Sequence, residues 1–162
     1  MRRLLARIDS EPHGTLDWGY CHGDFRPANV HFDENADQVT AFDFEFGATG
    51  FRAYDIAYTL TNFHPMALKV LWGAPVLDNY ELVWAAFLRG YGERRPLRSE
   101  DLKIIPLFAA ARVIPMMATL LKSARQHTNA ETWPPSEPGG LAGGALFDRA
   151  LSFLRAWDLE YL

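Results

Sequence analysis

Two stretches decide the fold: His22-Gly23-Asp24-Phe25-Arg26-Pro27-Ala28-Asn29-Val30 and, shortly after it, Asp43-Phe44-Glu45-Phe46-Gly47. Asn29 stands five positions after Asp24, and Asp43 stands fourteen positions after Asn29. A kinase catalytic loop needs these three groups: an Asp that accepts the proton of the attacking hydroxyl, and an Asn and a second Asp that hold magnesium beside the nucleotide phosphates. The pattern therefore predicts a phosphoryl-transfer site, with Asp24 as the base and with Asn29 and Asp43 as ligands of the metal and its nucleotide.

The spacing of Asn29 and Asp43 has a physical reason. Residues 30–32 and 39–42 alternate between apolar and polar side chains around the polar link 33–37, which predicts a β-hairpin. Antiparallel strands lie about 4.8 Å apart, so a residue at the start of the first strand and one at the end of the second can share a cation. We therefore expect a short hairpin to carry the two metal ligands.

Structural alternatives exist for all three residues. Asp24 can be a turn aspartate that bonds its own backbone, and Asn29 and Asp43 can be ordinary hairpin ends. Their combination favours catalysis for Asp24 and metal binding for the other two, since hard cations prefer such oxygen ligands.

Four neighbours have less definite roles. Glu45 can be a second metal-shell carboxylate, a binder of a cationic substrate or a solvated loop residue. Arg26 can meet a phosphate or pair with a nearby acid. His22 is expected to support the loop through hydrogen bonds, and Asp55 is expected to accept bonds from the loop backbone at a helix start.

The motifs HGDFRPANV and AFDFEFG, and the run from Phe51 to Ala57, resemble the aminoglycoside phosphotransferase and choline kinase superfamily. The resemblance extends from about residue 20 to residue 59. It implies a protein-kinase-like fold, here α+β and mostly α-helical, with ATP as phosphoryl donor and Mg²⁺ as cofactor. Acceptors consistent with it are aminoglycosides, amino alcohols such as choline or ethanolamine, and homoserine, all carrying a hydroxyl. The acidic residues near the site would suit a cationic acceptor, but the sequence does not choose among these.

The rest of the chain predicts one domain, residues 1–162, built mainly from helices. Pro106 and Pro115 should kink or divide the helix that opens at residue 99. The expected helices are the end of one at 4–8 and four more at 53–63, from Asp78 to Gly90 and Gly92, from 99 to about 120, and at 147–157. Asp78 and Glu81 approximate a capping box at the start of the third of these helices. The expected loops are residues 47–50 and a mobile Pro- and Gly-rich segment at 127–144. Most of six aromatic residues near the site should be core rather than an ammonium cage: Phe44, Phe46, Phe51, Tyr54, Tyr58 and Phe63.

Composition excludes several classes of protein. The net charge is −4, and the scattered arginines form no basic stripe, so nucleic acid is not an expected partner. Cys21 is the single cysteine, which fits a reducing cytoplasm and is expected to be a small buried thiol. No apolar segment reaches the ~18 residues of a membrane span, and no signal peptide is visible.

A glycine-rich loop and a strand lysine, which hold the nucleotide in kinases, are not found in this sequence. The three lysines all fall in segments expected to be helical: Lys69, Lys103 and Lys122. The chain thus resembles the C-terminal lobe alone, with something missing upstream, and the face left by the absent lobe could support a homodimer. Two alternatives remain: a non-catalytic binding or regulatory remnant, and a metal-dependent hydrolase using His22, Asp24, Asp43 and Glu45.

Overall fold

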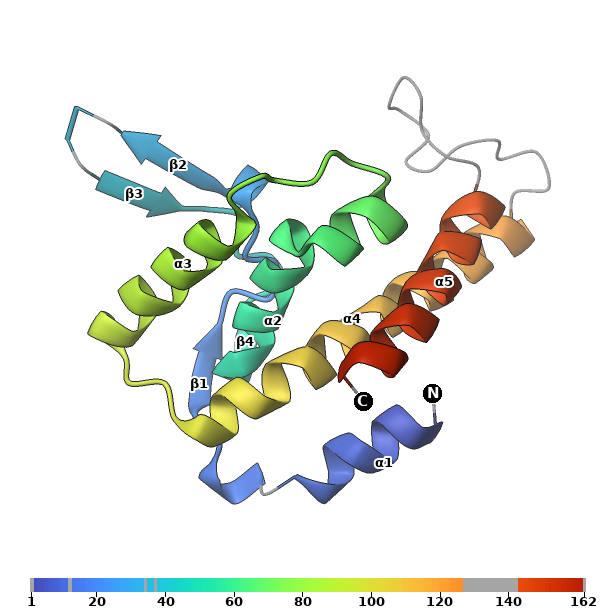
Figure 1. Cartoon of the computed structure of the whole chain (residues 1–162), viewed down its shortest axis with the longest axis horizontal. Helices are drawn as coiled ribbons and strands as arrows, with labels where there is room; N and C mark the ends of the chain where they lie inside the picture. The colour runs from blue at the N-terminus through green and yellow to red at the C-terminus, as the bar shows by residue number, and fades with distance from the viewer. Residues whose placement is uncertain (1, 12, 34, 37, 127–142, 162) are drawn as a thin grey trace.

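The computed structural model describes residues 2–11, 13–33, 35–36, 38–126 and 143–161. Most of these residues are helical, as the sequence predicts, and two small antiparallel sheets accompany the helices, one of which is the predicted hairpin (Figure 1). The elements are α1 (Arg2–Ser10), η1 (His13–Thr15), β1 (Trp18–Cys21), η2 (Pro27–Asn29), β2 (Val30–Asp33), β3 (Gln38–Ala41), β4 (Ala48–Phe51), α2 (Arg52–Phe63), η3 (Ala67–Trp72), α3 (Tyr80–Arg94), α4 (Ser99–Gln126) and α5 (Gly143–Tyr161).

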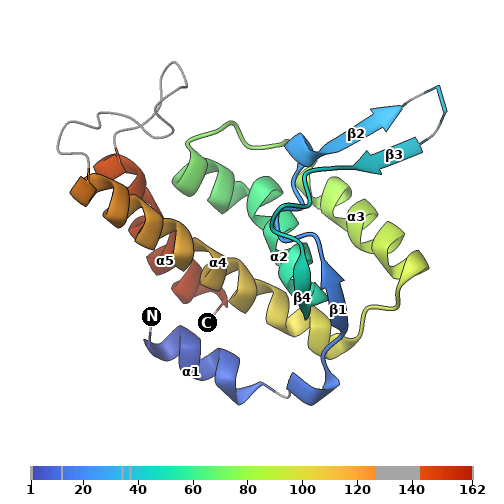
Figure 2. The same ribbon diagram turned by 180° about the vertical axis from the view of Figure 1, so that it is seen from behind.

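The two sheets determine where the predicted site residues lie. Strand β1 pairs antiparallel with β4, so that Trp18 lies opposite Phe51 and Cys21 lies opposite Ala48. Strand β2 pairs with β3 in the predicted hairpin, with Val30 opposite Ala41. The chain therefore leaves β1, passes through residues 22–29, where the sequence predicts the catalytic loop, forms the projecting hairpin, and returns beside β1 before α2 begins (Figure 2).

Helices α2, α4 and α5, together with the short π-helix η3, enclose the core. Its largest fully buried side chains include Trp157 and Phe153 of α5, Ile56 of α2 and Ile104 of α4. The indole N–H of Trp157 donates to the carbonyl of Pro106 at 2.9 Å, which joins α5 to α4.

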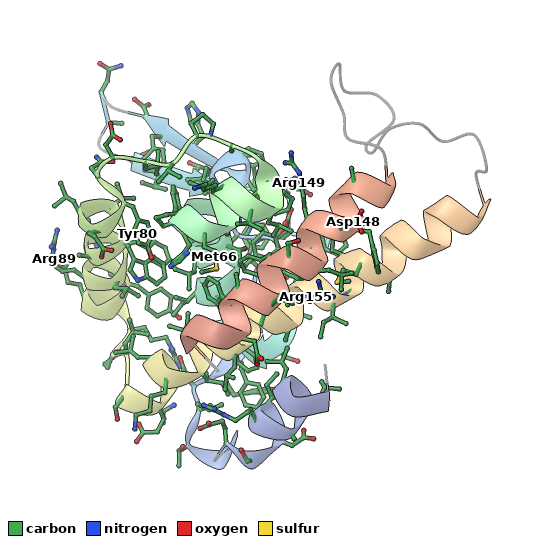
Figure 3. All side chains as sticks on the ribbon, turned by 45° about the vertical axis from the view of Figure 1, so that its right-hand side comes forward. Met66, Tyr80, Arg89, Asp148, Arg149 and Arg155 are labelled. Atoms are coloured by element: carbon green, nitrogen blue, oxygen red, sulfur yellow. The ribbon has the colours of Figure 1, made fainter. Side chains whose placement is uncertain are left out.

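Helix α3 lies at one side of this core. Tyr80, at its first turn, is buried and lies near Met66, whereas Arg89 points away from the body of the protein (Figure 3). The ring of Tyr80 packs edge-on against His64, which also contacts Trp157. The start of α3 is thus attached to the core through aromatic contacts.

Asp101 attaches α4 to the segment before β1. Its side chain is almost fully buried, and it accepts the backbone N–H of Asp17 at 2.9 Å and the guanidinium of Arg98 at 3.1 Å. Asp17 in turn pairs with Arg95, and that contact lowers the pKa of the Asp17 carboxyl. These bonds hold the start of α4 against the base of β1.

Several expected boundaries are wrong. Residues 48–50 are not loop but part of β4, whose partner β1 is distant in sequence. Helix α3 begins at Tyr80, without a side-chain capping bond at its N-terminus, and continues through Gly90 and Gly92. Helix α4 is not divided: a single helix runs through Pro106 and Pro115 and packs against α2 and α5.

The predicted mobile loop at 127–144 falls mostly outside the described residues. Only residues 143 and 144 are described, and they form the first turn of α5. Among the described helices, none is long and apolar enough to cross a lipid bilayer.

Candidate active site

The side chain of Asp55 binds the backbone of the catalytic loop. The side chain rises from the first turn of α2 and accepts the N–H of His22 at 2.6 Å and the N–H of Gly23 at 2.8 Å, one with each carboxylate oxygen. Thr59, one turn further along α2, donates its hydroxyl to the carbonyl of Phe25 at 3.1 Å. The loop is therefore fixed to α2 on both sides of Asp24.

Asp24 is buried and surrounded by polar groups. Its Oδ2 accepts a bond from Asn29 Nδ2 at 2.8 Å and lies 3.2 Å from Nε of Arg26. Its Oδ1 lies 3.8 Å from Nη2 of Arg112. Burial and a hydrogen bond with Asp24 raise the pKa of Tyr58 to about 12, so this phenol stays protonated at neutral pH. The carboxylate is thus held in one orientation by groups from the loop, α2 and α4.

His22 connects the catalytic loop to the segment around Asp43. Because the N–H of Asp24 donates to Nδ1 of His22 at 3.3 Å, Nε2 carries the ring hydrogen and donates it to the carbonyl of Phe42 at 2.9 Å. The imidazole also lies 4.2 Å, centroid to centroid, from the ring of Phe44. One side chain therefore contacts the residues on both sides of Asp43.

Asp43 has a strained backbone. Its φ is +66°, in the left-handed region that residues other than glycine rarely adopt, and its side chain is exposed. The N–H of Phe42 donates to the carbonyl of Asn29 at 3.1 Å, one position beyond the last pair of the β2–β3 hairpin. Such strain persists only where the surroundings impose it, and it is frequent at functional sites.

Glycines allow the two loops to meet. Gly23 has a φ of +80°, and a Cβ there would overlap the carbonyl oxygen of Phe46. A Cβ on Gly47 would overlap the hydroxyl of Tyr20. The segment that carries Asp43 thus packs directly on the backbone of the catalytic loop.

The side chains fit a magnesium site that is completed by a ligand. Both amide hydrogens of Asn29 are used by Asp24, one by its carboxylate and one by its carbonyl, which leaves Oδ1 of Asn29 for a cation. Within the described part of the chain no group of three His, Cys, Asp or Glu side chains could enclose a metal. Magnesium is commonly held by one or two protein oxygens, with waters and substrate phosphates supplying the rest, so a site of this kind would need no more than the two predicted ligands, Asn29 and Asp43.

The other predicted residues are placed differently. Arg26 is half-exposed and pairs with Asp24, whereas Glu45 lies in an exposed turn and makes no hydrogen bond or ion pair with the described residues. The expectation that most nearby aromatic residues are core holds for Phe51, Tyr54, Tyr58 and Phe63, but not for Phe44 and Phe46, which are exposed. Cys21 is buried as predicted, and burial raises the pKa of its thiol to about 11.

Arg112 was not found from the sequence. Its guanidinium lies over the ring of Tyr58, with the central carbon 2.8 Å from the ring centroid, and its Nη1 lies 3.5 Å from the hydroxyl of Tyr54. Residue 112 lies in the helix predicted to open at residue 99. The apolar pattern that predicts this helix marks only its buried face, to which an arginine does not belong. Asp24 and Arg112 are 88 positions apart in the sequence, so no local motif could indicate that they lie close together.

The family model described as the phosphotransferase enzyme family matches residues 1–97. An uncharacterised protein of Deinococcus radiodurans is 34% identical over 161 residues, which are 96% of this chain and 40% of that protein. A homoserine kinase of Caulobacter vibrioides is 31% identical over 118 residues, which are 72% of this chain and 34% of the kinase. The chain thus spans well under half the length of these relatives.

A solved structure gives the fold independently. Amicoumacin kinase hAmiN, in complex with AMP-PNP, Ca²⁺ and Ami, superimposes with a TM-score of 0.63 at 19% identity, over 98% of this chain and 42% of the kinase. At this identity the likeness concerns the fold alone. The kinase-like fold that the motifs predicted is confirmed.

Proposed function

Because the chain belongs to the phosphotransferase enzyme family, we propose that it carries the acceptor-activating and metal-binding part of an ATP- and Mg²⁺-dependent kinase acting on a hydroxyl of a small molecule. The observation that carries the proposal is the hydrogen bond from Asn29 to Asp24 at 2.8 Å. It brings together the two side chains that would serve as base and metal ligand in the catalytic loop of a kinase.

The residues have separate tasks in this reaction. Asp24 orients the acceptor hydroxyl and takes its proton through a carboxylate that Asn29 holds in place. Magnesium bound by Oδ1 of Asn29 and by Asp43 would neutralise charge on the phosphates. Arg26, beside Asp24 at 3.2 Å, is available to meet the transferred phosphoryl group. The phosphoryl group would then pass in line from ATP to the acceptor hydroxyl. The protein would promote this step by positioning the reactants and by stabilising the charge on the phosphates.

His22 argues against a metal-dependent hydrolase. Such a site would need the imidazole as a ligand, yet both ring nitrogens of His22 are engaged, one by Asp24 N–H and one by the carbonyl of Phe42. A non-catalytic binding role for the separate chain makes a different prediction: nucleotide binds, but no phosphoryl group is transferred. The cytoplasm, where ATP is abundant, is the compartment that suits the proposal.

Calorimetric titration of the purified chain with ATP and Mg²⁺ tests the proposal. Binding should disappear in Asp43→Ala and persist in Asp33→Asn, which removes one negative charge from the same hairpin while retaining the turn bonds to residues 35 and 36. Equal affinities in the wild type and Asp43→Ala would contradict the role of Asp43. Absence of binding in the wild type would show that this chain does not hold the nucleotide by itself.

A further inference from the structure

One face of α2 contacts the catalytic loop along successive loop residues. Asp55, Tyr58 and Thr59 stand at positions i, i+3 and i+4 of this helix, so their side chains share a face. Asp55 accepts the backbone N–H groups that precede Asp24, and Thr59 donates to the carbonyl that follows it, at Phe25. Tyr58, between them in the sequence, forms a hydrogen bond with the carboxylate of Asp24. The helix therefore contacts both the backbone of the loop and the side chain of the proposed base.

The hydroxyl of Tyr58 is the donor in this bond. The residue is only 8% exposed, and burial together with the hydrogen bond raises its pKa to about 12, so the phenol stays protonated. Oδ2 of Asp24 also has Asn29 Nδ2 at 2.8 Å and Arg26 Nε at 3.2 Å. Because a carboxylate accepts about four hydrogen bonds, these three neighbours leave about one direction for an acceptor hydroxyl.

Arg112 contacts Tyr58 more closely than it contacts Asp24. The central carbon of its guanidinium lies 2.8 Å from the centroid of the Tyr58 ring, whereas its Nη2 lies 3.8 Å from Oδ1 of Asp24. The second distance is longer than a hydrogen bond. A cation is attracted to the face of an aromatic ring, and more strongly where the pair is shielded from water. Arg112 thus holds the ring of Tyr58 in place from α4.

We propose that Tyr58 and Arg112 are positioning residues: the Tyr58 hydroxyl holds the carboxylate of Asp24 toward Asn29, and Arg112 acts on the base through the Tyr58 ring. The proposal rests on the phosphotransferase function above, in which Asp24 is the base. Loss of either residue should let the carboxylate rotate about its own side-chain bonds. The loop backbone should stay in place, because Asp55 still holds it.

Hydrogen exchange at the side-chain amide of Asn29 reports the position of the carboxylate without turnover. One amide hydrogen donates to Oδ2 of Asp24 at 2.8 Å and the other to the Asp24 carbonyl at 2.9 Å. NMR of the isotope-labelled chain follows both, and their signals are identified by their absence from Asn29→Ala. Tyr58→Phe should speed exchange of the hydrogen on Oδ2 about tenfold, the size expected for one hydrogen bond.

The backbone N–H groups of His22 and Gly23 distinguish positioning from a general loss of stability. Both are bonded to Asp55, so they should exchange at the wild-type rate in Tyr58→Phe. A variant that is only less stable would exchange faster at these groups as well. Equal acceleration at His22, Gly23 and Asn29, or a wild-type rate at Asn29, would overturn the proposal.

A double-mutant cycle tests the path from Arg112 to the base. Arg112→Gln should speed exchange at Asn29, and the double variant with Tyr58→Phe should exchange no faster than Tyr58→Phe alone. Arg112→Lys, which keeps a cation over the ring, should stay near the wild-type rate. An effect of Arg112→Gln that persists in the Tyr58→Phe background would show that its charge acts directly on Asp24, and would overturn the proposal. Should Arg112→Gln fail to fold, Arg112→Met, which keeps the length of the side chain, takes its place in the cycle.

Tyr91→Phe is the matched control. Burial raises the pKa of the Tyr91 hydroxyl, as it does for Tyr58, but the nearby charges that shift it further are those of Asp17 and Arg52 on the other side of the loop's supports. Loss of this hydroxyl should leave exchange at Asn29 unchanged. An acceleration as large as that in Tyr58→Phe would mean that any buried tyrosine hydroxyl matters equally, and would contradict the proposal.

Titration with ATP and Mg²⁺ separates this proposal from the function on which it rests. Tyr58→Phe should bind ATP as the wild type does and, in any preparation that transfers phosphate, should lower kcat about tenfold with KM for the acceptor within about twofold. Loss of ATP affinity with unchanged exchange at Asn29 would assign Tyr58 to the nucleotide site and overturn the proposal. Faster exchange in a chain that does not bind ATP would support the positioning of Asp24 while contradicting nucleotide binding by this chain.

Discussion

Asp55 and Gly23 are joined across 32 positions of sequence by a hydrogen bond of 2.8 Å, in which the glycine N–H donates to the carboxylate. The same carboxylate accepts the N–H of His22 at 2.6 Å. A charged acceptor shared by two successive backbone donors fixes the direction of the chain between them. The peptide that leads into Asp24 is thus positioned by α2 and not by the loop's own turns.

Asp55→Ala should therefore lower stability more than the loss of one surface charge would. Two backbone N–H groups lose their acceptor, which costs about 1–3 kcal/mol for each donor left unsatisfied. Urea denaturation should show the loss, and Asp78→Ala, an exposed acid before α3, should stay within about 0.5 kcal/mol of the wild type. Equal midpoints for the two variants would contradict the supporting role of Asp55.

The same substitution should have opposite effects at two glycines. Gly23→Ala places a Cβ on the carbonyl of Phe46 at a φ of +80°, so it should destabilise the protein and weaken ATP binding by displacing the segment that carries Asp43. Gly90→Ala lies within α3 with nothing within 4 Å of the new Cβ, and it should stabilise by about 0.5–1 kcal/mol. Thermal midpoints measure both effects.

Asp24→Asn separates chemistry from folding. The side chain keeps its shape but loses the charge that faces Arg26 and Arg112, so the chain should stay folded with a lower thermal midpoint, and ATP and Mg²⁺ should still bind. In any preparation that transfers phosphate to an acceptor, the rate should fall about a hundredfold to ten-thousandfold, the usual contribution of a general base. A variant with the wild-type rate would remove Asp24 from the mechanism.

Tyr58 should ionise late in an alkaline titration. Its folded pKa of about 12 lies above the unfolded value of 10.0, so its contribution to stability is complete below pH 10 and is lost as the pH rises toward 12. Tyr58→Phe should remove one high-pH step from the absorbance titration of the tyrosines. It should also reduce the loss of unfolding free energy between pH 10 and pH 12. The Cys21 thiol, with a pKa of about 11, also titrates there, so the comparison is best made in a Cys21→Ala background.

Exposed aromatic side chains predict self-association. Trp18 and Tyr20 of β1 are 57% and 59% exposed, and Phe46, next to Gly47 on which Tyr20 packs, is 62% exposed. Exposed apolar surface of this kind is typical of a contact site, here for a second copy of the chain. Sedimentation velocity should show a concentration-dependent dimer that Trp18→Ser weakens and Leu82→Ser, on α3, does not. A monomer at all concentrations would refute it.

The sequence predicted those parts of the site that are local. The hairpin, with Asn29 just before its first strand and Asp43 just after its second, follows from spacing and turn chemistry within some twenty residues, and the structure shows this hairpin. Helix α2 was found because its apolar face repeats along a single segment. Local patterns are sufficient where the neighbours that stabilise an element are close in sequence.

The features that were missed depend on distant partners. Strand β4 contains a glycine and has little strand signal of its own, and it forms because β1 is beside it. Helix α4 continues through two prolines, against their local cost, and packs along α2 and α5, which are distant in sequence. Arg112 reaches the site only after that helix has packed, so no motif could have identified it.

The hydrogen bonds of His22 predict how sequence changes in the hairpin affect the site. Its ring bonds the backbone before Asp43 and accepts the N–H of Asp24, so the base and the metal ligand are connected through a single side chain. The hydrogen bonds of His22 do not involve residues 34–37, which link β2 to β3 in the sequence. Insertions or replacements in this link should leave the placement of Asp43 unchanged, because Phe42 is held both by the imidazole of His22 and by its own N–H bond to the carbonyl of Asn29.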